Sequence, residues 1–469
     1  MKKNRLNILL TGLLVCFVFF MLSRYILDND YFWHIKAGEY MFNNGILRKD
    51  VFSWYLQGKY WMSHEWLFEI FLYTLKVIFG KIHVFVYCFL CLAILIFSLF
   101  YPNRKSLLKN LPFTLIYIIF FFLIFLGFVQ ARPHLLSFSL FSFGIYSLFD
   151  LYNNEDSKKV YFLPLITVFW ANFHGGSSNL IYLLCFIFII CGLFSFNYKK
   201  IEANRINSKQ IKKYLIVMLL CMVCVLINVH GLKMFIYPYQ NIMDSSMVNN
   251  ITEWRNTSLS SWYDYVYYFF VIFVLAIMLF SDKKINFVHL IIFMFTVYLG
   301  LKSIRFWPYA YITAIFFIYD YVKKRKIDRG SDICILFFSV LLLVYFCFGI
   351  GDRVKVLFKL SLNDEIVEII KEEKPSRLYN LYDYGGELIY HDIDVFIDGR
   401  ADLYSKYNYK DALDISRLTG DYEKLISKYD FDYFLVSKEY PINTYLKYSD
   451  KYQLIYKNKE VYFYKKKNS

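Results

Sequence analysis

The chain has 469 residues, of which 58% are hydrophobic and 22% aromatic, and its formal net charge is +15. Soluble domains are about 45–50% apolar, and apolar runs of membrane-spanning length recur here almost to residue 350, so the composition excludes a wholly soluble protein. The positive charge does not indicate nucleic-acid binding, because the basic residues cluster in short loops between apolar runs, where they set membrane orientation.

The apolar runs predict a polytopic α-helical membrane protein with about eleven membrane-spanning helices. They lie at residues 6–26, 82–100, 111–130, 134–152, 160–175, 180–196, 214–230, 263–280, 285–301, 307–322 and 331–350. The first run follows Lys2, Lys3 and Arg5 but precedes no small-x-small cleavage pattern, so we expect an uncleaved helix rather than a signal peptide.

Basic residues are distributed unevenly between the loops. Lys and Arg are frequent at residues 103–110, 155–159, 197–213, 281–284 and 323–330. The opposite loops are longer in total and poorer in basic residues. By the positive-inside rule, the N-terminus is cytoplasmic and the C-terminal segment is extracytoplasmic.

Two regions do not fit the pattern of spans. The first is the first outer loop, residues 27–81, in which residues 61–80 predict a helix. This helix carries His64, Glu65 and Glu69 among aromatic residues at helical spacing, as expected of a helix that lies in the membrane interface. The composition changes after the spans, which predicts a transmembrane domain at residues 1–350 and a small α/β domain at residues 351–469.

The C-terminal domain contains recognisable local patterns. Residues 363–375 predict an amphipathic helix, residues 421–430 a second helix, residues 394–400 and 431–437 strands, and residues 452–467 a hairpin. In "FIDGRADLY", Asp398 and Arg400 flank a glycine. This predicts a turn closed by an ion pair. The alternative interpretation is that the segment closes over the site.

On this topology, ionisable residues from well-separated segments converge on the outer face. They are Asp28, Asp30, His34, His64, Glu65, Arg132, His134, His174, His230, Glu253 and Arg305. Ionisable groups at membrane depth are costly and usually functional. Their convergence from distant segments therefore predicts one site.

Several of these residues also have a simpler interpretation. Asp30 could cap a helix beginning at Tyr31, and an Asp30–His34 pair on one helix face could be structural. Arg132 and Arg305 could extend to lipid headgroups.

Two of the histidines share a local pattern. His174 and His230 occur in the same Asn-x-His-Gly pattern at the ends of two outward-running helices. A shared role is one interpretation. For His174, packing around the two following glycines is another.

The residue types indicate transfer at a membrane surface. A carboxylate can accept the proton of an acceptor hydroxyl, and arginines can hold a phosphate leaving group. Asp28 and Asp30 could bind a divalent cation, or one could raise the pKa of the other. The sequence contains no P-loop and no Gly-rich dinucleotide turn. A lipid-linked donor therefore fits better than a nucleotide-linked one.

These features resemble the GT-C superfamily of polytopic glycosyltransferases, which use polyprenyl-phosphate-linked sugars and carry acidic residues just after the first helix. A closer resemblance is to a group of largely uncharacterised bacterial membrane proteins with this fold. The shared stretches are "DNDYFWHIKAGEYMFNNGILRKDVFSW", "WMSHEWLFE", "ARPHLLSF", "WANFHGG", "NVHGLKMFIYP", "ITEWRN", "SIRFWPYA" and "YGGELIY…VFIDGRADLY".

The resemblance implies a GT-C-like arrangement in a bacterial cytoplasmic membrane and an inverting transfer to a glycan, lipid or protein acceptor. It implies that Asp28 or Asp30 is the base, that the other acid positions the acceptor or a metal, and that Arg132 and Arg305 hold the donor phosphate. The remaining residues would line the cavity: His34, His64, Glu65, His134, His174, His230 and Glu253.

Two other functions remain open from the sequence. A transporter of lipid-linked or small polar substrates would place ionisable groups near the middle of the membrane, and the predicted spans contain few of them. A non-catalytic scaffold that binds glycans, lipids or proteins would keep the same fold without transfer activity.

Overall fold

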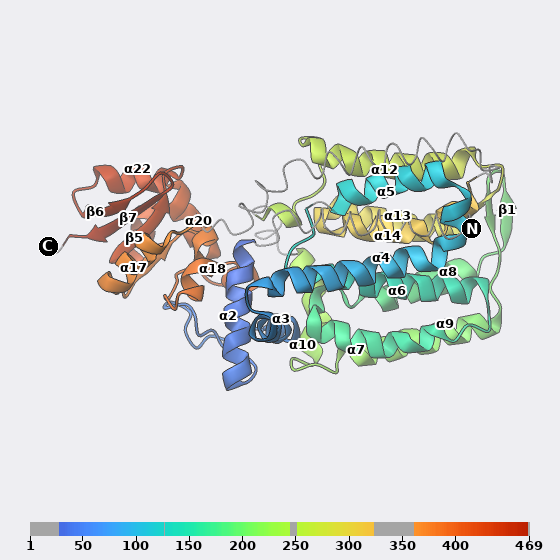
Figure 1. The fold of residues 1–469 in the computed structure, drawn as a ribbon, viewed down its shortest axis with the longest axis horizontal. Coiled ribbons are helices and arrows are strands. Elements are labelled where there is room, and N and C mark those ends of the chain that lie inside the picture. Colours follow the sequence, from blue (N-terminus) through green and yellow to red (C-terminus); the bar gives the residue numbers. More distant parts are fainter. Residues whose placement is uncertain (1–27, 126, 244–250, 323–360, 468–469) are drawn as a thin grey trace. The chain divides into compact units, whose positions relative to one another are not determined.

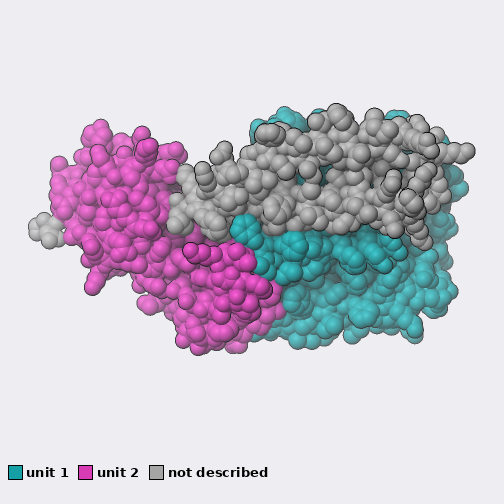
Figure 2. Space-filling view, viewed as in Figure 1, with its two compact units in different colours: residues 1–26, 85–357 teal, residues 27–84, 358–469 magenta. Residues whose placement is uncertain are grey.

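The computed structural model describes residues 28–125, 127–243, 251–322 and 361–467 (Figure 1). The predicted spans at residues 6–26 and 331–350 lie outside these ranges. Contacts divide the chain into two compact units (Figure 2). Unit 1 comprises Met1–Ile26 and Phe85–Leu357, and unit 2 comprises Leu27–Val84 and Phe358–Ser469. The predicted first outer loop thus groups with the C-terminal segment.

Unit 1 is built from helices, and every predicted span inside the described ranges overlaps one of them. They are α4 (His83–Lys109), α5 (Leu111–Phe125), α6 (His134–Asn153), α7 (Leu163–Phe173), α8 (Leu180–Gly192), α9 (Ser208–Val225), α10 (Leu232–Met243), α12 (Trp262–Phe280), α13 (Phe287–Lys302) and α14 (Trp307–Ile315). The sequence did not predict α10. The predicted total of eleven spans stays a prediction.

The helices of unit 1 have the surface of a membrane-embedded bundle. Among the described residues, three apolar stretches of unit 1 are long enough to cross a membrane: His134–Asn153, Gly175–Gly192 and Trp262–Phe280. A fourth, Trp66–Arg104, begins in unit 2 and continues into unit 1. Large apolar side chains also point outward, such as Leu219 and Val223 on α9 and Phe269 on α12. A helix that is apolar on all sides requires either protein or lipid around it. The composition and the exposed apolar surface together place this unit in a membrane.

Helices α7, α8, α9, α13 and α14 pack side by side in the bundle (Figure 1). Short strands close one of its ends. β1 (Phe196–Tyr198) pairs antiparallel with β2 (Ile201–Ala203), and β2 pairs parallel with β3 (Ile285–Asn286). The sequence predicted a plain loop at residues 197–213 and the start of a span at residue 285, and neither prediction included strands. Their pairing connects the loop between α8 and α9 to the loop before α13.

Unit 2 combines two helices of the predicted outer loop with an α/β fold. The outer-loop helices are α2 (Asn29–Asn44) and α3 (Trp66–Phe79), followed by the short helix η1 (Gly80–Ile82). The remaining elements are α17 (Asp364–Glu373), β4 (Leu378–Asn380), α18 (Tyr382–Tyr390), α19 (Ala401–Tyr404), α20 (Tyr409–Arg417), α21 (Tyr422–Tyr429), β5 (Tyr433–Ser437), α22 (Pro441–Tyr448), β6 (Tyr452–Lys457) and β7 (Val461–Lys466).

The sheet of unit 2 has the strand order β4-β5-β7-β6. β4 and β5 are parallel, and the other two pairings are antiparallel. The structure confirms α17, α21, β5 and the β6–β7 hairpin as predicted. α3 begins at Trp66, so residues 61–65 of the predicted helix form the segment that leads into it.

The predicted strand at residues 394–400 is wrong. Val395, Phe396 and Ile397 are buried, but only Val395 forms a β-bridge, an isolated one with Ser53. The Asn380 side chain accepts from the Phe396 N–H at 2.8 Å and donates to the Ile397 carbonyl at 2.7 Å. A side chain thus satisfies backbone groups that a neighbouring strand would otherwise bond.

Candidate functional site

The first acidic residue of the outer loop caps a helix. Asp28 is the N-cap of α2, and its Oδ1 accepts a hydrogen bond from the Tyr31 N–H at 3.1 Å. The alternative interpretation of Asp30 as the helix cap is therefore wrong, because α2 begins at Asn29 and not at Tyr31. An Asp at this position satisfies a free backbone donor and complements the positive end of the helix.

Asp30 lies in the first turn of α2, against the turn formed by residues 398–400. Its Oδ1 accepts from Trp33 Nε1 at 3.1 Å. A Cβ atom added to Gly399 would lie only 1.7 Å from this Oδ1. Gly399 therefore gives the Asp30 carboxylate room that no other residue would leave. The glycine of "FIDGRADLY" thus accommodates Asp30, while its two charged neighbours form an ion pair.

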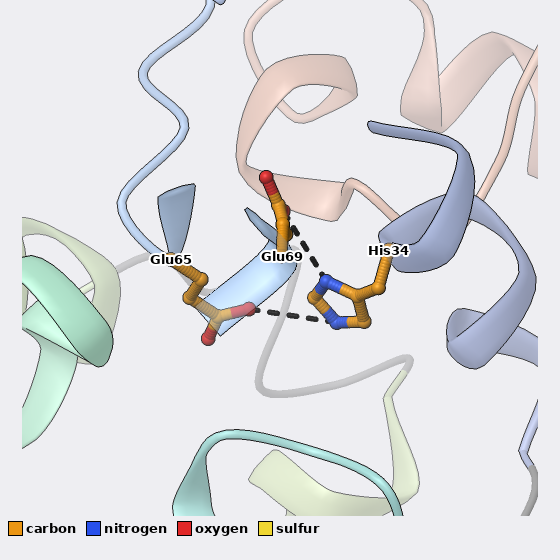
Figure 3. A group of neighbouring side chains, drawn as sticks. All are labelled: His34, Glu65 and Glu69. Carbon is orange, nitrogen blue, oxygen red and sulfur yellow. Dashed lines mark hydrogen bonds and ion pairs between the residues drawn. The ribbon is translucent and has the colours of Figure 1, made fainter. Parts of the chain in front are cut away.

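His34 does not pair with Asp30 as the helical spacing suggested. Its Nδ1 lies 3.2 Å from Glu69 Oε1, and its Nε2 lies 3.5 Å from Glu65 Oε2 (Figure 3). All three side chains are buried, with exposed fractions of 1% for His34, 6% for Glu65 and 0% for Glu69. Figure 3 shows them pointing toward one another from α2 and from the start of α3. This group could hold a metal ion.

Two further ionisable groups extend the cluster. His64 Nε2 lies 3.3 Å from Glu65 Oε1, and His64 Nδ1 lies 3.8 Å from Asp402 Oδ2. Burial by itself would lower the pKa of His64, but the neighbouring carboxylates, Glu65 first, raise it. Burial raises the pKa of Asp402, with His64 opposing the shift. Imidazoles and carboxylates therefore alternate through this part of unit 2.

A second buried network in unit 2 is centred on Arg400. Its Nη1 donates to Asp50 Oδ1 at 2.5 Å, and its Nε and Nη2 donate to Asp398 at 2.8 and 2.6 Å. The Tyr404 hydroxyl donates to Asp398 Oδ2 at 2.6 Å. Burial would raise the pKa of Asp50, but the Arg400 guanidinium and the Ser53 hydrogen bonds lower it. The predicted ion pair between Asp398 and Arg400 is confirmed.

Several members of these networks were not predicted as site residues, among them Glu69, Asp50 and Asp402. Glu69 follows Glu65 by one helical turn, and that spacing could have indicated a shared face. No comparable spacing in the sequence marks Asp50 or Asp402 as a member of a site. Asp50 meets Arg400 across 350 positions of the chain, and local spacing contains no information about such a contact.

In unit 1, Arg132, Glu253 and Arg305 form a charged cluster. Arg132 Nη1 donates to both carboxylate oxygens of Glu253, at 2.8 and 2.9 Å, and Arg305 Nη2 lies 3.8 Å from Glu253 Oε2. The Arg305 guanidinium also lies over the Trp254 ring, 4.9 Å from its centroid. Burial would raise the pKa of Glu253, yet the two guanidiniums lower it to about 2. Glu253 therefore stays ionised at physiological pH.

The other predicted residues of unit 1 are its three histidines. His134 Nε2 lies 2.9 Å from the Phe128 carbonyl oxygen. His174 Nδ1 lies 2.7 Å from Ser137 Oγ, which also accepts from Trp170 Nε1 at 2.9 Å. At His230, the backbone N–H donates to Asn228 Oδ1 within a turn.

The matching sequence pattern around His174 and His230 thus corresponds to two different local structures. Asn172 nonetheless connects the two loops, because its side-chain amide donates to the Ile227 carbonyl at 2.8 Å. The pattern marks a contact between the ends of α7 and α9. A shared chemical role for the two histidines stays a prediction.

The predicted site residues fall into two sets. Unit 2 contains Asp28, Asp30, His34, His64 and Glu65, and unit 1 contains Arg132, His134, His174, His230, Glu253 and Arg305. Some members of each set contact one another, such as His34 with Glu65 in unit 2 and Arg132 with Glu253 in unit 1. The expectation of a single site that unites all eleven stays a prediction.

The fold and these clusters define a helical membrane protein with a second, mixed α/β unit. The sequence matches no protein-family model and no curated protein. Among solved structures, the oligosaccharyltransferase of Archaeoglobus fulgidus in its apo form is similar, with a TM-score of 0.46 and 11% identity over 91% of this chain and 69% of that chain.

Two other structures from the same organism are similar at 10% identity. The oligosaccharyltransferase AglB in complex with an inhibitory peptide and a dolichol-phosphate has a TM-score of 0.44, over 91% of this chain and 69% of that chain. The complex with Zn and sulfate has a TM-score of 0.43, over 97% of this chain and 73% of that chain. All three TM-scores are below 0.5.

Proposed function

We propose that the chain is a membrane glycosyltransferase that moves a sugar from a polyprenyl-phosphate-linked donor to a hydroxyl acceptor at the outer face of a bacterial cytoplasmic membrane. The observation that carries the proposal is the cluster of Arg132, Glu253 and Arg305 in unit 1. Two guanidiniums share one carboxylate there, so these three groups carry a net positive charge. An anionic headgroup attached to an apolar tail suits a basic cluster on an apolar helical bundle.

Arg305 is the stronger candidate for the donor phosphate. Its distance of 3.8 Å from Glu253 is too long for a hydrogen bond. Its Nε is buried and has no hydrogen-bond partner among the described residues. Stacking on Trp254 fixes the plane of the guanidinium. A planar group with unused donors matches the oxygen atoms of a phosphate.

Arg132 has a different local role. It is 9% exposed, it bonds Glu253 through Nη1, and the Tyr87 hydroxyl donates to its carbonyl oxygen at 2.7 Å. We assign it to holding Glu253 in place and to adding positive charge to the phosphate site. Glu253 limits the charge of the cluster, so that the phosphate can leave after transfer.

We assign the general base to Asp30 rather than to Asp28. Asp28 is the helix cap, whereas the Asp30 carboxylate has space provided by Gly399. The acceptor hydroxyl oxygen would attack the anomeric carbon, and the bond from that carbon to the phosphate oxygen would break. Asp30 would take the hydroxyl proton, and polyprenyl phosphate would leave with its electron pair. The sugar would be transferred with inversion.

The test of the proposal compares Arg305→Gln with Lys302→Gln. Lys302 is exposed at the end of α13, three positions from Arg305, and contacts none of the three cluster residues among the described contacts. Both changes remove one positive charge. Membranes from an overexpressing strain would be supplied with radiolabelled polyprenyl-phosphate sugars, and transfer would be followed together with detergent gel filtration.

We expect Arg305→Gln to lose transfer while Lys302→Gln retains it, with both variants eluting as the wild type does. Filter binding of radiolabelled polyprenyl phosphate, with unlabelled polyprenol as competitor, separates headgroup from tail recognition. Equal transfer by the two variants would exclude Arg305 as the phosphate ligand. Absence of transfer by the wild type with every donor would instead favour a binding scaffold.

A further inference from the structure

We infer that His34, Glu65 and Glu69 form a binding site for a divalent cation of the zinc type within unit 2. This inference goes beyond glycosyl transfer and does not depend on it. It also differs from the site at Asp28 and Asp30 that the sequence suggested, because Asp28 caps α2 and neither acid belongs to this group of three.

The local fold brings the three ligands together. Glu65 is the N-cap residue of α3 and Glu69 lies one turn later, so both can face the same neighbour. That neighbour is α2, which carries His34. The two helices approach closely at Gly38, where an added Cβ atom would lie 2.1 Å from the Glu69 carbonyl oxygen. A residue with a side chain at position 38 would push α2 away from the carboxylates.

The separations between donor atoms suit a small cation. Zinc binds histidine nitrogen and carboxylate oxygen at about 2.0–2.2 Å in a tetrahedron, so two of its ligands lie about 3.4 Å apart. The His34–Glu65 separation of 3.5 Å is close to this value. One ligand atom from each of the three residues lies within 4.8 Å of the others. Small side-chain adjustments would therefore close the site around an ion.

The outer oxygens of both carboxylates already have partners. Glu69 Oε1 faces His34, while its Oε2 accepts from the Ser63 hydroxyl at 2.9 Å. Glu65 Oε2 faces His34, while its Oε1 lies 3.3 Å from His64 Nε2. Metal sites typically have such a second layer of hydrogen bonds, which orients the ligands. Ser63 and His64 would have that role here.

The donor set favours zinc over magnesium and calcium. Imidazole nitrogen suits zinc and related transition metals, whereas magnesium and calcium prefer sites made only of oxygen. Three protein ligands leave a fourth position for water. The ion would bind one imidazole nitrogen of His34 together with both carboxylates, and would thereby join α2 to α3. Bound metal should therefore stabilise unit 2 as well as occupy the site.

The experiment measures metal content and needs no transfer assay. The full-length protein in detergent would be treated with EDTA, supplied with zinc, desalted and analysed by mass spectrometry for zinc. Glu69→Gln and His34→Gln remove ligands. Glu39→Gln is the matched control, because Glu39 lies on the exposed side of α2 and pairs with Lys36. Cobalt loading, read by the visible absorption of tetrahedral Co²⁺, reports on the same ligands.

We expect about one zinc per chain in the wild type and in Glu39→Gln, and a loss of most of it in both ligand variants. Zinc should raise the thermal unfolding midpoint of the EDTA-treated wild type, and magnesium should not. Because this comparison uses the unmutated chain, misfolding of a variant cannot account for it. Zinc content that is unchanged by Glu69→Gln and His34→Gln, or an unfolding midpoint insensitive to zinc, would overturn the inference. The three residues would then be a buried group held by hydrogen bonds and ion pairs, without a metal.

Discussion

Replacing Arg400 by Gln should strongly destabilise unit 2. The Arg400 side chain and both of its acidic partners, Asp50 and Asp398, are fully buried. Its guanidinium donates to one oxygen of Asp50 and to both oxygens of Asp398. Removing one partner of a buried ion pair costs about 3–5 kcal/mol, because the other charge remains without compensation. Here two carboxylates would remain.

A loss of this size should be visible as a shift in thermal unfolding. For a domain of 150–250 residues, each kcal/mol corresponds to about 2–4 °C, so the midpoint should fall by about 6–20 °C. Scanning fluorimetry of the full chain in detergent measures the shift, and limited proteolysis shows whether unit 2 opens. The double variant Asp50→Asn/Arg400→Gln should be less destabilised than the sum of its single changes, because the two residues interact directly.

Arg377→Gln is the matched control. Arg377 pairs with Asp430 at 2.9 Å, but both side chains are more than half exposed, and such pairs contribute about 0–1 kcal/mol. The same chemical change should therefore shift the midpoint by only a few degrees. If Arg400→Gln behaved like Arg377→Gln, the argument that the buried network holds unit 2 together would be refuted.

Three further predictions concern the same unit. Gly399→Ala should displace Asp30 and lower the free energy of unfolding by about 1–3 kcal/mol, which thermal unfolding would show. An unchanged unfolding midpoint together with unchanged transfer would contradict the close contact. Asp28→Ala should cost about 0.5–2 kcal/mol, whereas Asp28→Asn should be nearly neutral because Asn caps helices equally well; equal midpoints for the two variants would exclude a capping role. Because the folded pKa of Asp50 is lowered, its stabilising contribution should persist above the unfolded pKa of about 3.9 and decline as the pH falls through the folded value. A pH series of unfolding midpoints, with Asp50→Asn as the variant that lacks this decline, measures the effect.

Local patterns predicted the elements that local forces determine. The helix α17 has an Asn363 cap and an apolar face, and both strands of the β6–β7 hairpin are rich in aromatic and β-branched residues on either side of a short polar turn. These features act within a few residues, so a reading of the sequence finds them. The helices of the bundle were equally accessible, because a span must be apolar along its whole length to lie in lipid.

The errors arose where distant residues decide the structure. The segment "DVFIDGR" has the composition of a strand, but its backbone bonds go to the Asn380 side chain and to residues 52 and 54 of the outer loop. Asp30 is positioned by Gly399, which lies far along the chain. No spacing rule contains these contacts. They follow from the way the outer loop and the C-terminal segment fold as one unit.

The same reasoning explains why charged residues lie inside unit 2. An apolar set of similar volume could often replace a buried ion pair without loss of stability, so the Arg400 network is weak evidence for stability alone. Its donors do fix one arrangement, because Asp50, Asp398 and the Tyr404 hydroxyl must each meet the guanidinium in a set direction. Displacing residue 50 would leave a buried carboxylate without its partner, whereas apolar surfaces would tolerate the shift. The network therefore specifies how the outer loop docks on the C-terminal segment, and through Gly399 that docking also sets the position of Asp30.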